Sequence, residues 1–95
     1  MENVTLSIFV PCLNEESNIK NTLNNIKEAI INISYEILIV DDGSKDNTIK
    51  IVEKFANDNS NLKIKIFHNK KNHGIGFNYF ATANDAIGKY YMLIN

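Results

Sequence analysis

Two adjacent carboxylates, Asp41 and Asp42, come directly after an apolar, mostly β-branched run at residues 37–40. Such a run is typical of a strand buried on both faces, which delivers the two charges to the carboxyl edge of a parallel sheet. Open α/β folds bind ligands at that edge, where a carboxylate can accept hydrogen bonds. A second apolar run, residues 6–10, ends in the polar segment 11–16. The sequence therefore predicts a binding site where two strand ends meet.

Helices are expected between the strands that carry these groups. Apolar residues recur at spacings of four and three over residues 15–31, which predicts a first helix with Asn14 as its N-cap. A second helix is expected over residues 47–57, capped by Asp46, and a third over residues 74–87. The chain thus alternates between strand and helix, as α/β proteins do.

Two further strands complete the expected fold. Residues 62–67 alternate apolar side chains with lysine, which is typical of a strand exposed on one face, and residues 90–94 are interpreted as a fourth, buried strand. Right-handed crossovers then give a parallel sheet of strand order 3-2-1-4, provided that the third helix returns the chain past the first strand. The switch point lies between the first and fourth strands, and residues 11–15, residues 41–44 and Asn95 are expected to converge there.

Composition limits the possible partners and surroundings. A chain of 95 residues with 44% hydrophobic and 22% charged residues describes one soluble domain. The net charge of −1 offers no basic field for nucleic acid and no polybasic patch for a membrane. The single cysteine, Cys12, fits a reducing compartment. Without a signal peptide or a run of about 20 apolar residues, the sequence predicts a cytoplasmic protein with no transmembrane segment.

Four blocks of sequence resemble, in their order and spacing, the opening half of a family 2 glycosyltransferase. They are SIFVPCLNE at residues 7–15, IVDDGSKDNT at 39–48, NHGIG at 72–76 and AIGKY at 86–90. The resemblance implies a Rossmann-like, three-layer α/β arrangement that forms the N-terminal half of a GT-A fold. It also implies binding of a nucleoside diphosphate sugar, with a mild preference for a UDP-sugar.

The resemblance also implies what lies outside residues 1–95. In the similar enzymes the fourth strand leads into an acidic motif that holds a divalent cation, Mg or Mn, on the diphosphate. An acceptor-binding half with the catalytic base follows. Residues 1–95 are therefore expected to be a partial domain, truncated before both, in which neither a catalytic residue nor a metal ligand can be assigned.

Nucleotide-binding roles are carried over by resemblance to Pro11, Leu13, Glu15, Val40 and Asp42. The first three align with positions that frame the base and ribose, and Asp42 aligns with an acid that accepts a hydrogen bond from a base imide or a ribose hydroxyl. Structural alternatives stay open for two of them. Asp42 can start the following turn through an Asx-type bond, and Glu15 can act as a helix-dipole partner.

The sequence departs from the family pattern at two points. Leu13 stands where an aromatic side chain often stacks on the base, so part of a stacking energy on the order of 1–3 kcal/mol is lost. Residues 78–80, Asn-Tyr-Phe, stand where the family usually carries Ala-Arg-Asn. The missing arginine removes a cation that could face the base or the phosphates.

Other reactive side chains have simpler interpretations. Cys12 has no histidine near it in the sequence, which favours a small buried residue over a thiolate nucleophile. His68 and His73 lack the spacing of a metal site and are expected to be solvated. Residues 74–76 lack the third glycine of a dinucleotide fingerprint and indicate a tight turn. Asp41 should point away from Asp42 and brace the following loop.

The sequence thus predicts a glycosyltransferase-like domain for nucleotide-sugar binding. In a full enzyme it would serve sugar transfer to a glycan, lipid or protein acceptor, as in polysaccharide biosynthesis. The chain alone is expected to be inactive, because charge stabilisation of the diphosphate and a catalytic base are needed for the reaction. The alternatives are a non-catalytic nucleotide-binding or assembly module, and a truncated product without activity. A bare edge on the fourth strand predicts self-association.

Overall fold

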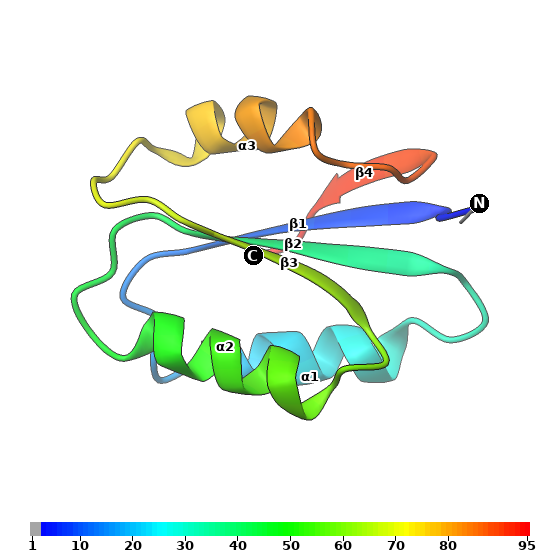
Figure 1. Cartoon of the computed structure of the whole chain (residues 1–95), viewed down its shortest axis with the longest axis horizontal. Coiled ribbons are helices and arrows are strands. Elements are labelled where there is room, and N and C mark those ends of the chain that lie inside the picture. The colour runs from blue at the N-terminus through cyan, green and yellow to red at the C-terminus, as the bar shows by residue number, and fades with distance from the viewer. Residues whose placement is uncertain (1–2) are drawn as a thin grey trace.

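The computed structural model describes residues 3–95, and within that range a four-stranded sheet lies between two helical layers (Figure 1). The elements in chain order are β1 (Leu6–Cys12), α1 (Ile19–Ala29), β2 (Tyr35–Asp41), α2 (Thr48–Asp58), β3 (Lys63–His68), α3 (Ile75–Ala83) and β4 (Tyr90–Leu93). Helices α1 and α2 cover one face of the sheet, and α3 lies over the other. The predicted three-layer α/β fold is confirmed.

All strand pairs are parallel, and the strand order is β3-β2-β1-β4, as the sequence predicts. β1 pairs with β2 along its whole length, with Leu6 opposite Tyr35 and Cys12 opposite Asp41. On its other side β1 pairs with β4, where Leu6 lies opposite Tyr90. The chain therefore winds outward from β1 to β3, and then α3 carries it back past β1 to β4.

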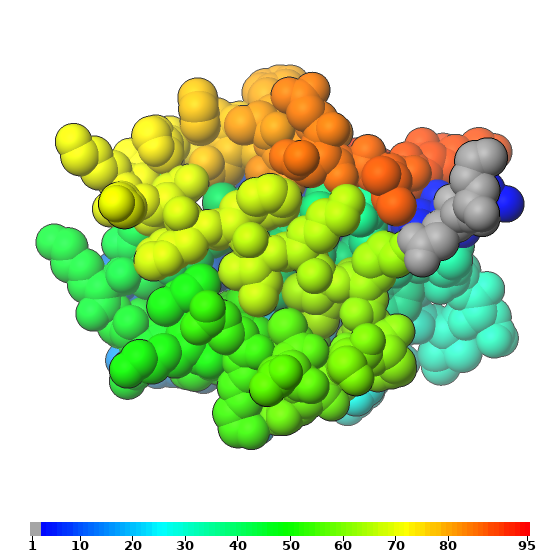
Figure 2. All heavy atoms as spheres, in the orientation of Figure 1, coloured from blue at the N-terminus to red at the C-terminus, as the bar shows by residue number. Residues whose placement is uncertain are grey.

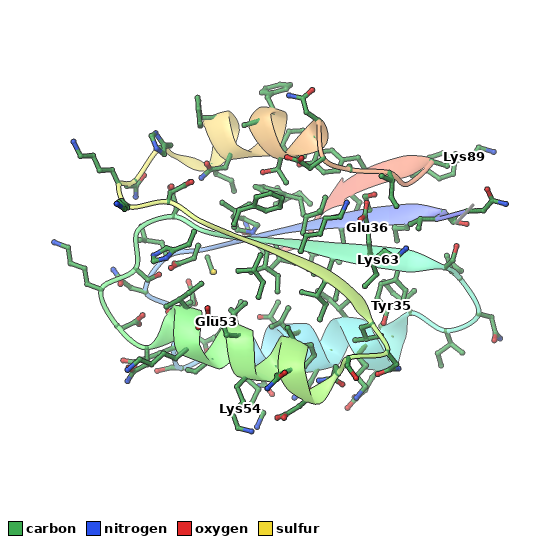
Figure 3. The ribbon with its side chains drawn as sticks, viewed as in Figure 1. Tyr35, Glu36, Glu53, Lys54, Lys63 and Lys89 are labelled. Atoms are coloured by element: carbon green, nitrogen blue, oxygen red, sulfur yellow. The ribbon has the colours of Figure 1, made fainter. Side chains whose placement is uncertain are left out.

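The hydrophobic core lies between the sheet and the α1–α2 layer. Leu23 of α1 and Val52 of α2 are fully buried against alternate residues of the two central strands. Burying a side chain of this size stabilises the fold by roughly 1.5–3 kcal/mol. The buried core consists of Ile8, Val10, Cys12, Ile19, Leu23, Ile26, Ile37, Ile39, Val52 and Phe55. On the outer surface of α2, Lys54 points away from the sheet (Figure 3).

The opposite face of the sheet is partly polar. Tyr35 packs against the α1–α2 core, whereas the next residue, Glu36, is fully buried on the α3 side (Figure 3). Ser7 lies beside it on β1 and is also fully buried. In the space-filling view, β3 and the segment after it cross the front of the molecule between the helical layers (Figure 2). The α3 layer is thus joined to the sheet by hydrogen bonds as well as by apolar contact.

Two of the predicted helix ends are wrong by a full turn, and the structure gives a reason for each. α1 begins at Ile19 instead of residue 15, because Asn14 has a φ of 52° and residues 15–18 form a turn. Asn14 is therefore not its N-cap. α3 ends at Ala83 instead of residue 87, because the amides of Ile87 and Gly88 donate to side chains of the sheet.

The fourth strand is exposed, where the sequence predicts a buried one. It ends at Leu93, and Tyr90, Met92 and Leu93 are 59%, 45% and 40% exposed. The strand is apolar, but it lies at the edge of the sheet next to β1. The N-cap of α2 is Asn47, one residue after the predicted Asp46, although Asp46 Oδ1 accepts a hydrogen bond from the Thr48 amide at 3.0 Å.

Candidate functional site

A cleft of about 230 Å³ opens at the carboxyl ends of the strands, at the predicted switch point. This volume is below the roughly 300–1,000 Å³ that is usual for small-molecule sites, so the cleft can enclose only part of a nucleotide-sized ligand. The residues that line it are Pro11, Cys12, Leu13, Glu15, Asp42, Asn72, Gly74, Ile75, Asn78 and Asn95.

The structure brings four of the five sequence-predicted binding residues to this cleft. Pro11, Leu13, Glu15 and Asp42 line it. Val40 does not: it is only 2% exposed and pairs within the sheet between Pro11 and Phe67. Its side chain therefore lies in the sheet interior and does not reach the cleft that the other four line.

Asp42 is held by three donors from the segment that follows β3. Its Oδ1 accepts hydrogen bonds from the His73 amide at 2.9 Å and from Asn69 Nδ2 at 3.1 Å. Its Oδ2 accepts one from the Gly74 amide at 2.9 Å. Burial by itself raises the pKa of this carboxyl, but the hydrogen bonds outweigh it and lower the pKa to about 2. Asp42 is therefore ionised and fixed in place.

Asp41 points to the other face, as the alternation of strand residues predicts. It is fully buried, and its Oδ1 accepts hydrogen bonds from the amide and the hydroxyl of Ser44. Its Oδ2 lies 3.3 Å from Nε2 of His68. The expected role of Asp41 as a brace for the following loop is confirmed. His68 and His73 are both exposed, in agreement with their predicted solvation.

The loop that carries Leu13 and Glu15 is fastened to the loop after β2. The Asn14 amide donates to Ser44 Oγ at 2.8 Å, and Asn14 Oδ1 accepts from the Lys45 amide at 2.8 Å. The Glu15 amide donates to Thr48 Oγ1 at 2.8 Å. Asn14 can do this because asparagine tolerates the left-handed backbone better than most residues. This bridge fixes the loop that brings Leu13 and Glu15 to the cleft.

The sequence did not identify Asn69, Asn72 and Asn78 as site residues. Asn78 is 3% exposed, and its Oδ1 accepts a hydrogen bond from Asn69 Nδ2 at 3.0 Å. Among the residues that the structure describes, its Nδ2 makes no hydrogen bond of ordinary length, although Asn78 is one of the groups that lower the pKa of Asp42. The only signal in the sequence is that residues 78–80 depart from the pattern of the similar family.

The sequence matches the profile "Glycosyl transferase family 2" over residues 7–95. The chain belongs to glycosyl transferase family 2. It is 30% identical over 102 residues to dolichyl-phosphate beta-glucosyltransferase of Dictyostelium discoideum, covering 100% of this chain and 31% of that protein. The chain spans less than a third of the length of the curated relatives that it matches first. The matched part makes up 31%, 27% and 31% of those three proteins.

Solved structures of glycosyltransferases share the fold of this family 2 domain. S. aureus TarS 1-349 in complex with UDP-GlcNAc superposes with a TM-score of 0.82 at 29% identity, over 96% of this chain and 26% of that one. Mannosyltransferase PcManGT from Pyrobaculum calidifontis, in complex with GDP-Man and Mn2+, gives a TM-score of 0.82 at 23% identity, over 94% and 26%. The domain therefore has the GT-A arrangement.

The charges around the cleft of this family 2 domain are negative. Its described lining contains the carboxylates of Glu15 and Asp42 and no lysine. Burial, and then the neighbouring carboxylates of Asp41 and Glu15, raise the pKa of the Cys12 thiol to about 12, so the thiol stays protonated. Cys12 is thus a small buried residue, as expected. The cleft suits a hydrogen-bond donor better than a phosphate group.

The described residues of this family 2 domain do not supply a set of side chains that could coordinate a metal ion. Within residues 3–95, no group of three or more His, Cys, Asp or Glu side chains is placed to hold one. Asp42 already accepts three hydrogen bonds from the protein, so one of the roughly four acceptor positions of its carboxylate remains for a ligand. Over the same residues no helix has both the length and the apolar character to cross a membrane.

Proposed function

We propose that this domain binds the nucleoside part of a nucleoside diphosphate sugar in the cleft at the ends of β1 and β2. The observation that carries the proposal is the meeting of Pro11, Leu13, Glu15 and Asp42 around one opening at the switch point of a family 2 glycosyltransferase domain. An ionised, immobile carboxylate is a good acceptor for a base N–H or a ribose hydroxyl.

The base and ribose are the parts of the ligand that this cleft suits. Glu15 and Asp42 repel a diphosphate, and no cation lines the described wall to offset them. Leu13, 38% exposed, offers apolar contact to the face of a base. The diphosphate would therefore extend out of the cleft. We prefer UDP as the nucleotide, because S. aureus TarS, 29% identical, has been solved in complex with UDP-GlcNAc.

In the whole protein the bound donor would be used for sugar transfer, and we propose a lipid phosphate as the acceptor. The name of the Dictyostelium discoideum relative, dolichyl-phosphate beta-glucosyltransferase, supports this acceptor class. A structure of PcManGT contains Mn2+ with GDP-Man, and among residues 3–95 of this chain no group of three or more His, Cys, Asp or Glu side chains is placed to hold such an ion.

Two further properties belong to the same proposal. A free, buried Cys12 fits a reducing compartment, and we place the protein in the cytoplasm, as an enzyme of polysaccharide or glycolipid assembly. The exposed edge of β4 gives a row of unpaired backbone groups with apolar side chains beside it, which favours pairing with a second copy of this chain.

A titration followed by amide chemical shifts tests nucleotide binding. UDP added to the isotope-labelled 95-residue chain should shift the amides of Leu13, Glu15, Asp42 and Gly74, because these residues form or border the cleft. Inorganic pyrophosphate should leave them unshifted. Shifts confined to the lysines of residues 70–71, or no shifts at millimolar UDP, would refute the proposal.

A pair of variants locates the site. Glu15→Gln, in the cleft, should change the affinity for UDP. Glu53→Gln, on the exposed side of α2, removes the same charge from the protein and should leave the affinity unchanged. An equal change in both variants would mean that the overall charge of the protein, and not the cleft, decides binding.

A further inference from the structure

The outer face of α3 is apolar and largely uncovered. The helix turns Asn78 and Thr82 toward the sheet, where they are 3% and 6% exposed. Because an α-helix has 3.6 residues per turn, the side opposite these two is formed by residues 76, 77, 80 and 83. On this outer face Phe77 and Phe80 are 60% and 75% exposed, and the whole helix contains no charged residue. A surface helix normally has a charged or polar outer side, so this face is suited to a partner.

Positive charge is concentrated in the layer that contains α3, although the net charge of the protein is −1. Residues 69–95 contain three lysines and one acid, Asp85. Residues 1–68 contain seven lysines and ten acids. The α3 layer is therefore basic, and the rest of the protein is acidic.

The three lysines lie at the two ends of the outer face. Lys70 and Lys71 are in the segment before α3, and Lys89 follows the helix at the other end of the same layer (Figures 1 and 3). Lys89 Nζ lies 5.6 Å from the centre of the Tyr90 ring, and none of the three lysines forms an ion pair with a residue of the described range 3–95. Their charges are thus available to an anionic partner.

We propose that the outer face of α3 binds the surface of a membrane that contains anionic phospholipids. Phe77 and Phe80 enter the boundary between the headgroups and the acyl chains, and the lysines at both ends of the helix lie among the lipid phosphates. Interfacial helices combine these two features, aromatic side chains on the buried side and lysines at the level of the headgroups. The contact goes beyond nucleotide binding and does not depend on it, because Phe77 and Phe80 do not line the cleft.

Charge favours a membrane over a second copy of this chain as the partner. With lysines at both ends of α3, two copies that meet through their outer faces bring lysine against lysine in either orientation, and like charges repel. Lipid phosphates attract the same lysines. Gly74 and Ile75, at the beginning of α3, line the cleft, so a bilayer on the outer face lies beside its opening. This arrangement suits the lipid phosphate acceptor proposed above.

Flotation of the 95-residue chain with lipid vesicles tests the inference. The wild-type chain should float with vesicles of phosphatidylcholine and phosphatidylserine, and should not float with vesicles of phosphatidylcholine alone. Phe80→Ser should weaken binding to the anionic vesicles by about tenfold, because it removes one aromatic side chain from the membrane boundary. Ile31→Ser is the matched control: Ile31, in the loop after α1, is 68% exposed, and its substitution should leave binding unchanged.

A second pair of variants tests the charge. Lys71→Gln should weaken binding to the anionic vesicles by about fivefold, as expected for one lysine beside an anionic leaflet. Lys50→Gln removes the same charge from α2, on the other face of the sheet, and should leave binding unchanged.

Three outcomes would overturn the membrane contact. The first is equal binding, or no binding, to the two kinds of vesicle. The second is an equal loss of binding in a variant and its matched control. The third is a chain that does not float but whose mass in light scattering falls on Phe80→Ser, because the face then joins two copies. Lys71→Gln keeps the test decisive if Phe80→Ser does not fold. UDP titration is measured separately, so failure of vesicle binding leaves the proposed nucleotide binding standing.

Discussion

Asp42 combines a structural and a proposed binding role in one side chain. Three donors, the amides of His73 and Gly74 and the side chain of Asn69, hold its two oxygens. In Asp42→Asn one oxygen becomes an NH2 group, which faces an N–H donor whichever way the amide is turned. A pKa of about 2 against an ordinary 3.8 corresponds to roughly 2 kcal/mol of stability at neutral pH. We expect Asp42→Asn to lose about this amount, measured by urea unfolding at pH 7.

The control and the pH dependence follow from the same argument. Asp58→Asn removes an exposed carboxylate that pairs with Lys54, and should cost less than about 1 kcal/mol. Because the folded pKa of Asp42 is depressed, its contribution is present above pH 4 and is lost as the pH falls from about 4 to 2. The stability difference between wild type and Asp42→Asn should shrink over that range. A difference that is constant with pH would contradict the ionised carboxylate.

For single residues, the sequence predicted which face of the sheet a side chain points to better than it predicted the hydrogen-bond partners of that side chain. Because side chains alternate between the two faces of a strand, the sequence correctly predicted that Asp41 and Asp42 point to opposite faces of the sheet. The donors to Asp42 lie 27, 31 and 32 residues away in the sequence, so no local pattern contains them. Asp42 supports the segment after β3 much as Asp41 supports Ser44.

Among the elements, the connection from α3 to β4 depends on a close approach at Gly88. Its amide donates to Ser7 Oγ at 2.7 Å, while Glu36 accepts from the Ile87 amide at 2.7 Å and from the Ser7 hydroxyl. Burial by itself raises the pKa of Glu36, but these bonds and the ion pair with Lys65 outweigh it and hold the pKa below its ordinary value. The buried carboxylate thus stays charged and fastens the connection to the sheet.

A methyl group at residue 88 should break this arrangement. A Cβ there would lie 2.5 Å from Ser7 Oγ and 2.6 Å from the Ser7 amide nitrogen, which only a backbone shift can relieve. We expect Gly88→Ala to destabilise the protein by about 1–3 kcal/mol or more, measured by urea unfolding. Gly76→Ala, in α3 with no atom within 4 Å of the added Cβ, should be neutral or stabilising. Equal stability of both variants would contradict the close approach.

The boundaries of α3 show why elements are predicted more reliably than their ends. All three helices were predicted, and in the right order along the chain. The predicted third helix continued to residue 87, because nothing in the sequence indicates that the amides of Ile87 and Gly88 bond to Glu36 and Ser7, 51 and 81 residues away. The same holds for Asn14, whose partners Ser44 and Lys45 lie beyond the next strand.

The whole molecule has one well-covered face and one open edge. β4 is an edge strand with exposed Tyr90, Met92 and Leu93, and Phe77 and Phe80 of α3 are 60% and 75% exposed on the same side of the sheet layer. We expect the 95-residue chain to self-associate through the β4 edge, so that light scattering gives a mass above that of the monomer and rising with concentration.

A charge on that edge should reverse the association. Met92→Lys places a lysine on the exposed edge strand and should lower the scattering mass toward that of the monomer. Ile33→Lys, an equally exposed apolar residue in the loop before β2, is the control and should leave the mass unchanged. A wild-type chain that stays monomeric at high concentration would refute pairing through β4. The strand order that creates this edge followed from the alternation of strands and helices, but its exposure did not.

The positions of Glu36 in β2 and of Asp42 directly after that strand have a thermodynamic consequence. Both carboxylates face α3, and they hold the chain at opposite ends of that helix: Asp42 binds the amides of residues 73–74, and Glu36 binds the connection at residues 87–88. Docking of α3 and occupation of the cleft therefore share one residue, Asp42. By linkage, a ligand that gains affinity from the docked helix must stabilise the docking by the same free energy. Substitutions near Glu36, far from the cleft, can then tune ligand affinity without touching the ligand.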